Sequence, residues 1–85
     1  MQIAYILINI KPDSEMEVIK QIKDAMKNEG GSVRYEIQGV YGVYDIIVKI
    51  ESESMDNVKN TLAKIRRIGK IFATLTMPVI EEQEA

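Results

Sequence analysis

Residues 40–45 read Val-Tyr-Gly-Val-Tyr-Asp and lie between two strand-like runs of the 85-residue chain. Gly42 favours a turn at this point, because glycine adopts positive φ angles without the steric cost that other residues meet. We therefore expect the segment to connect two strands as a hairpin. It also places aromatic hydroxyls and a carboxylate beside a glycine backbone, and we interpret it as the rim of a small-molecule site.

The runs on either side of this segment have the alternation of strands. From Ser32 to Gly39, apolar and polar side chains alternate, which is typical of a half-exposed edge strand. From Tyr44 to Glu51, every second residue is apolar and forms one face. The sequence therefore predicts a pair of neighbouring antiparallel strands around the central turn.

Two further strands are predicted near the ends of the chain. Gln2 to Ile10 is apolar on both faces, so both faces must be covered. Ile71 to Ile80 contains Pro78, which lacks an N–H and is typical of an edge strand. Strict alternation predicts one face made of Ile71, Ala73, Leu75, Met77 and Val79. It predicts the opposite face from Phe72, Thr74, Thr76 and Ile80.

Two segments have the periodicity of amphipathic helices. The first begins at the capping box Ser14-Glu15-Met16-Glu17, runs to about Asn28 and ends before Gly30-Gly31. The second begins at Ser54 and runs to about Arg67, with cations in its last turn, where they suit the negative end of the helix dipole. Each helix carries one apolar stripe, so each is expected to cover one face of a sheet.

The predicted order is β-α-β-β-α-β, in the α+β class. Right-handed crossovers and a central hairpin lead to a ferredoxin-like α/β sandwich, a four-stranded antiparallel sheet with two helices on one face. We expect one domain over residues 1–80 and an acidic flexible tail at 81–85. The uncovered sheet face is apolar, so we interpret it as an association surface.

Composition excludes several classes of function. The chain has no cysteine, no histidine and a net charge of −2. Because the chain lacks histidine and shows no nucleophile-base pair, we expect no metal site, no cofactor and no enzymatic activity. There is no clustered basic face for direct nucleic-acid binding and no apolar run long enough to span a membrane, and we expect no signal peptide. We therefore expect a cytoplasmic protein.

The candidate ligand-binding residues are Tyr41, Gly42, Val43, Tyr44, Asp45, Thr74 and Thr76. A carboxylate accepts hydrogen bonds from a ligand ammonium group, and free backbone N–H groups at a glycine hold a ligand carboxylate. The hydroxyls of the two threonines would line a polar pocket. In the alternative interpretation, Asp45 only bonds nearby N–H groups and stabilises the turn.

Gly42-Val43-Tyr44-Asp45, followed by Ile-Ile-Val-Lys-Ile, resembles the Gly-x-Tyr-Asp signature of the effector-binding (RAM) domain of Lrp/AsnC transcriptional regulators. Ile65-Arg66-Arg67-Ile68-Gly69 and Thr74-Leu75-Thr76-Met77-Pro78-Val79 are similar to the second-helix end and last strand of that domain. Ala4-Tyr5-Ile6-Leu7-Ile8 is similar to its first strand. The resemblance covers nearly the whole chain.

The resemblance implies a free-standing effector domain without the helix-turn-helix of the family, and hence no direct DNA binding. It implies a homodimer formed by two facing sheets, assembly of dimers into rings such as an octamer, and amino-acid effectors bound where dimers meet. The chain would then sense an amino acid and modulate full-length Lrp/AsnC relatives, and with them transcription, by mixed assembly. Tyr41 stands where many members have Ser or Thr.

Other functions remain open from the residues alone. One is a ligand-free structural assembly unit, and another is a small dimeric ferredoxin-like enzyme. An ACT-type amino-acid-binding domain has the same order of elements. The glycine-tyrosine-aspartate turn lies between the second and third strands, and this position favours the Lrp/AsnC arrangement.

Overall fold

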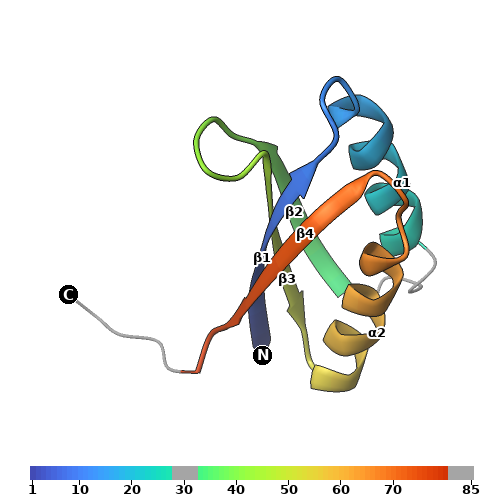
Figure 1. The fold of residues 1–85 in the computed structure, drawn as a ribbon. Coiled ribbons are helices and arrows are strands. Elements are labelled where there is room, and N and C mark those ends of the chain that lie inside the picture. The colour runs from blue at the N-terminus through green and yellow to red at the C-terminus, as the bar shows by residue number, and fades with distance from the viewer. Residues whose placement is uncertain (28–32, 81–85) are drawn as a thin grey trace.

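The computed structural model describes residues 1–27 and 33–80. In chain order its elements are β1 (Gln2–Ile10), α1 (Glu15–Lys27), β2 (Val33–Gly39), β3 (Ile46–Ser52), α2 (Met55–Arg66) and β4 (Ile71–Pro78). The strands form one antiparallel sheet in the order β2-β3-β1-β4, and both helices cover the same face (Figure 1). This is the predicted ferredoxin-like α+β fold.

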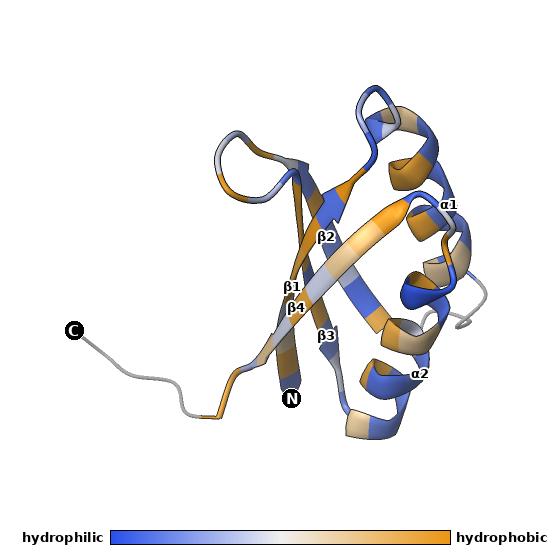
Figure 2. Ribbon diagram, in the orientation of Figure 1, coloured by the Kyte–Doolittle hydropathy of each residue, from blue (hydrophilic) through white to orange (hydrophobic). Residues whose placement is uncertain are grey.

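β1 lies inside the sheet. It pairs with β3 on one side and β4 on the other, so Ile6 lies opposite both Val48 and Thr76. Alternate residues of β1, from Ala4 to Ile10, are buried on the helix side. Figure 2 shows β1 as largely hydrophobic and β2 as largely hydrophilic. β2 and β4 are the two edge strands, as predicted.

The core fills the space between the sheet and the helices. Full burial of one large aliphatic side chain contributes about 1.5–3 kcal/mol, so this layer supplies most of the favourable free energy of folding. The buried apolar residues are Ala4, Ile6, Ile8, Ile10, Val18, Ile22, Met26, Val33, Ile46, Val48, Ile50, Val58, Ile65 and Ile68. Among the described residues, no helix has the length and hydropathy needed to cross a bilayer.

The two helices begin where the sequence predicts, but their first residues are held differently. The Ser54 hydroxyl caps α2 by accepting from the Asp56 N–H at 3.2 Å. The Ser14 hydroxyl instead donates to the Lys11 carbonyl at 2.6 Å, and within the described part of the chain it accepts no bond from α1. The predictions for Asn28, Gly30-Gly31, Ser32 and the 81–85 tail lie outside the described residues.

A β-bulge in β4 overturns part of the predicted face assignment. Asn9 pairs with Ala73 but Ile10 pairs with Ile71, so Phe72 is an extra residue on β4. A bulge interrupts the strict alternation of side chains. Ile71 therefore packs against the core, and the prediction that it shares a face with Leu75 was wrong.

Candidate functional site

The loop from Val40 to Asp45 connects β2 to β3 and projects beyond the sheet, away from the helical layer (Figure 1). The Val40 N–H donates to the Asp45 carbonyl at 2.9 Å and closes the loop. Gly42 has a φ of 132°, a conformation that side-chain-bearing residues rarely adopt. A Cβ added there would meet no atom within 4 Å, so the backbone angle, not crowding, requires the glycine. β3 begins at Ile46, two residues later than predicted, because Tyr44 and Asp45 belong to this loop.

Asp45 joins the loop to the end of β1. Its backbone N–H donates to the Ile8 carbonyl at 3.0 Å, and its carboxylate Oδ2 accepts from the Ile10 N–H at 2.9 Å. The side chain thus replaces the main-chain partner that Ile10 loses where the β1–β3 ladder ends. Within the described part of the chain, the other carboxylate oxygen accepts no hydrogen bond. One oxygen is therefore structural and the other is available.

A cavity of about 370 Å³ lies beside the loop, lined by Glu15, Gly39, Val40, Tyr41 and Asp45. Glu15 was predicted only as part of the capping-box segment of the first helix, not as a site residue. It reaches the cavity because the turn before α1, with Asp13 at a φ of 62°, places the start of α1 beside the loop. Among the described residues, two carboxylates and no cation line this cavity, so its electrostatic potential favours a positively charged group.

The other predicted site residues divide into two groups. Tyr41 and Val43 are exposed on the loop, at 106% and 83% of their full accessible surface, and Tyr44 is half-buried. Thr74 and Thr76 lie on the helix side of β4, opposite Ile8 and Ile6 respectively, and do not line the loop cavity. The Thr76 hydroxyl is buried and has no hydrogen-bond partner among the described residues.

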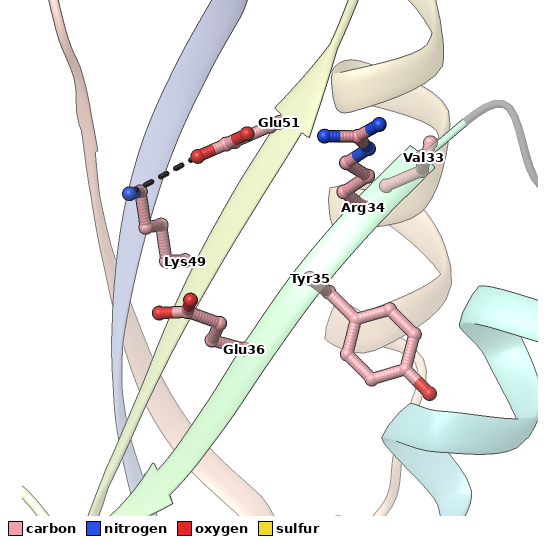
Figure 3. Close-up of a pocket in the computed structure, with 6 residues that line it drawn as sticks. All are labelled: Val33, Arg34, Tyr35, Glu36, Lys49 and Glu51. Carbon is pink, nitrogen blue, oxygen red and sulfur yellow. Dashed lines mark ion pairs between the residues drawn. The ribbon is translucent and has the colours of Figure 1, made fainter.

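The sheet face opposite the helices divides into an apolar half and a charged half. The apolar half, over β1 and β4, consists of Ile3, Tyr5, Leu7, Leu75 and Met77. The charged half, over β2 and β3, carries Arg34, Glu36, Lys49 and Glu51, which we call the charge quartet, and ends at Gln38 and Ile47. These four residues, with Val33 and Tyr35, line a second cavity of about 460 Å³ (Figure 3).

One ion pair lies within the charge quartet. Lys49 Nζ and Glu51 Oε1 are 3.0 Å apart. The hydrogen bond to Glu51 and the charge of that carboxylate raise the pKa of Lys49 above its usual value of 10.5. Both side chains are partly exposed, so the pair contributes little to the stability of a single copy.

Comparison with solved structures finds relatives that match over the full chain. FFRP-DM1 is 32% identical, with a TM-score of 0.75, over 94% of this chain and 100% of that chain. The hypothetical protein PHS023 from Pyrococcus horikoshii is also 32% identical, with a TM-score of 0.75, over 96% of this chain and 93% of that chain. AsnC from E. coli is 24% identical with a TM-score of 0.62, and the chain covers 54% of its length.

No protein-family model and no curated protein matches the sequence. The structural relatives nevertheless match the resemblance drawn from the Gly42-Val43-Tyr44-Asp45 motif, and AsnC shares the same fold. Kinship with these regulators supports a regulatory or effector-binding module. At 32% identity over nearly the full length of both chains, this protein belongs to the Lrp/AsnC family.

Proposed function

We propose that this protein binds an amino acid or a similar small metabolite at the Val40–Asp45 loop and assembles into oligomers around that site. The observation that carries the proposal is the position of Asp45. Its carboxylate is fixed by the Ile10 N–H through one oxygen and lines the loop cavity, where no cation neutralises it. Fixed carboxylates of this kind are suited to binding an ammonium group, because no rotamer freedom is lost on binding.

A free amino acid presents an ammonium group and a carboxylate a short distance apart. In the proposed complex, the second oxygen of Asp45 accepts from the ammonium group, and Glu15 adds a second negative charge beside it. Backbone N–H groups around Gly42 and the hydroxyl of Tyr41 are the donors for the ligand carboxylate. Tyr41 and Val43 supply apolar surface for the ligand side chain.

A second subunit would be needed to enclose the ligand. Binding sites usually bury most of a small ligand, whereas Tyr41 and Val43 are almost wholly exposed in a single copy. We therefore place the ligand between two dimers that meet at this loop, in a ring such as an octamer. A ligand that binds only the assembled form stabilises that form by mass action.

The dimer in this proposal forms through the sheet face opposite the helices. Leu75 and Met77 are 45% and 43% exposed there, beside the half-buried Tyr5 and Leu7. An 85-residue chain buries only about 60–65% of its unfolded surface, so covering this face with a second copy adds stability that one copy lacks. A full-length Lrp/AsnC relative with a matching face is the proposed partner for mixed assembly.

The decisive experiment compares two substitutions of Asp45 by calorimetry and light scattering against a panel of amino acids. Asp45→Asn keeps an acceptor for the Ile10 N–H but removes the charge, whereas Asp45→Ala removes both. We expect Asp45→Asn to fold normally and to weaken binding about 10- to 100-fold, since a hydrogen bond to a charged group contributes about 1.5–3 kcal/mol. The matched control is Asp24→Asn, which changes an exposed carboxylate on α1 into a carboxamide. This variant should bind the amino acid as the wild type does.

A ligand-free assembly unit is the second candidate, and the Asp45–Ile10 hydrogen bond favours it. In that case the carboxylate serves only the fold. No amino acid would then bind or change the mass of the assembly, and Asp45→Ala would lower stability alone. Failure to form mixed particles with a full-length relative at matched concentrations would rule out the modulator role independently.

A further inference from the structure

The charge quartet has an alternating arrangement that depends on the register of β2 against β3. Arg34 lies directly opposite Glu51, and Glu36 lies directly opposite Lys49. Along β2 the sign changes from Arg34 to Glu36, and along β3 it changes from Glu51 to Lys49. Each charge therefore has opposite charges as its neighbours along and across the strands, and the net charge of the quartet is zero.

Two members of the quartet are unpaired in a single copy. Lys49 and Glu51 pair with one another, as the dashed line in Figure 3 shows. Among the residues that the structure describes, Arg34 and Glu36 form no ion pair, and both are exposed. Figure 3 shows both side chains extending from β2 on the cavity side. The unpaired members have opposite charges, so each is the complement of the other.

We propose that the charge quartet pairs with the quartet of a second copy and sets the orientation of the sheet-to-sheet dimer. The inference rests on the dimer proposed above. The required symmetry axis lies between the two sheets, perpendicular to the strands, and passes between the Arg34–Glu51 row and the Glu36–Lys49 row. This rotation places Arg34 of one copy opposite Glu36 of the other and Lys49 of one copy opposite Glu51 of the other.

The same rotation places β4 opposite β4 and β1 opposite β1. The axis crosses β1 at Ala4 and β4 at Pro78, so Tyr5 of one copy lies opposite Ile3 of the other and the apolar residues nearest the axis cover one another. A two-fold axis parallel to the strands at the middle of the sheet would instead place β2 opposite β4. Glu36 would then face an apolar region that contains Leu75 and Met77, and burying a charge without a partner is strongly unfavourable. A parallel axis between β2 and β3 would pair Arg34 with Glu51 of the other copy but leave the apolar halves uncovered. Among these axes, only the perpendicular one pairs the charges and also brings apolar residues of β1 from the two copies together.

In this arrangement the two halves of the face have different roles. Apolar burial supplies affinity, whereas the alternating charges supply selectivity and orientation. A relative that presents like charges at these positions would be rejected, because like charges would meet across the interface. The partner that fits best is a second copy of this chain, and mixed assembly is limited to relatives with the same alternation.

Complementation between charge-reversed copies tests both the pairing and the orientation. Arg34→Glu places two acids opposite each other at two symmetric positions, and we expect its dimer dissociation constant to rise at least about tenfold at low salt. Glu36→Arg should have the same effect by itself. An equimolar mixture of the two should form a dimer of near wild-type affinity, because each reversed charge then meets its complement. Mass by light scattering and sedimentation gives the readout, and circular dichroism confirms folding.

Two controls separate this inference from other outcomes. Lys23→Glu, on the exposed surface of α1, changes the net charge equally and should leave the dimer intact. Glu51→Arg should not rescue Arg34→Glu, because the perpendicular axis does not place these positions opposite each other. If Glu51→Arg restored dimerisation of Arg34→Glu, the proposed orientation would be wrong. If neither Glu36→Arg nor Glu51→Arg restored it, the proposed charge pairing would be wrong.

Separate results would exclude the sheet-to-sheet dimer and the charge pairing within it. A wild-type protein that is monomeric at all concentrations would overturn the sheet-to-sheet dimer itself. A dimeric wild type whose Arg34→Glu variant dimerises equally well would leave the dimer standing and remove the charge quartet from its interface. Amino-acid binding is measured separately and does not enter either outcome.

Discussion

The backbone N–H of Ile10 donates a 2.9 Å hydrogen bond to the carboxylate of Asp45, across 35 positions of the sequence. Ile10 is the last residue of β1 and is nearly fully buried, and its position coincides with the register shift of β4. The carboxylate therefore fixes the end of the central strand and the base of the loop at once. The loop geometry and the end of the sheet depend on the same side chain.

The first prediction concerns the stability that this hydrogen bond provides. Asp45→Ala leaves the partly buried N–H of Ile10 without a partner, so we expect a loss of about 1–3 kcal/mol in the free energy of unfolding. Asp45→Asn retains an acceptor oxygen and should lose less than half of that. Urea unfolding of both variants measures the difference. Equal losses would show that the charge, not the acceptor, stabilises the loop.

Gly42 gives a second prediction, because its backbone angle and its surroundings have separate effects. Gly42→Ala should lower the free energy of unfolding by about 1–3 kcal/mol through strain at a φ of 132°, since an added Cβ meets no atom within 4 Å. Gly39→Ala is the matched control, because Gly39 has equal space and no positive φ. A Gly39→Ala loss as large as that of Gly42→Ala would contradict the assignment of strain.

Much of the fold follows from local patterns in the sequence. The order of elements, the edge positions of β2 and β4 and the cap at Ser54 were all predicted, because each depends on residues close in the chain. The bulge at Phe72 was not, since a bulge is set by the register against β1 and leaves no mark in the residue types of β4. The error in the face of Ile71 follows directly from it.

The candidate site was predictable only in part for the same reason. The loop was recognised because glycine, tyrosine and aspartate lie next to one another in the chain. Glu15 was missed, because its place in the cavity depends on how α1 packs beside the loop. The partner of Asp45 was missed too, since Ile10 is distant in sequence and takes part through its backbone, which residue identity does not encode.

The apolar half of the sheet face opposite the helices gives a third prediction. Met77→Lys places a charge on a surface that the dimer buries, and we expect dimerisation to be lost while the free energy of unfolding of the monomer changes by less than about 0.5 kcal/mol. Met16→Lys is the control, because Met16 is 88% exposed on the helical layer. Sedimentation measures association, and a Met16→Lys variant that also loses the dimer would place the interface on the helices instead.

A fourth prediction follows from the raised pKa of Lys49. A group whose pKa is raised on folding favours the folded state while it is protonated, and that contribution is lost as the pH rises through the folded pKa. The contribution is therefore complete at neutral pH and declines only above about pH 10.5. Lys49→Arg stays charged throughout and should flatten this decline in unfolding experiments between about pH 9 and 12. If stability declined with pH in the same way in Lys49→Arg, the decline would come from another titrating group.

The buried hydroxyl of Thr76 gives the last prediction. It lies on the helix side of β4 and has no hydrogen-bond partner among the described residues, so the folded state bears the cost of removing it from water. Thr76→Val keeps the shape of the side chain and removes the hydroxyl, and we expect a gain of about 1 kcal/mol in the free energy of unfolding. Thr74→Val, two residues away on the same face, is the control and should show no such gain.

Calorimetric titration of Thr76→Val with the bound amino acid then decides between two roles for this hydroxyl. Unchanged affinity would make Thr76 a core residue, whereas a loss of affinity would show that this hydroxyl contacts the ligand in the assembled protein and that stability has been given up for binding.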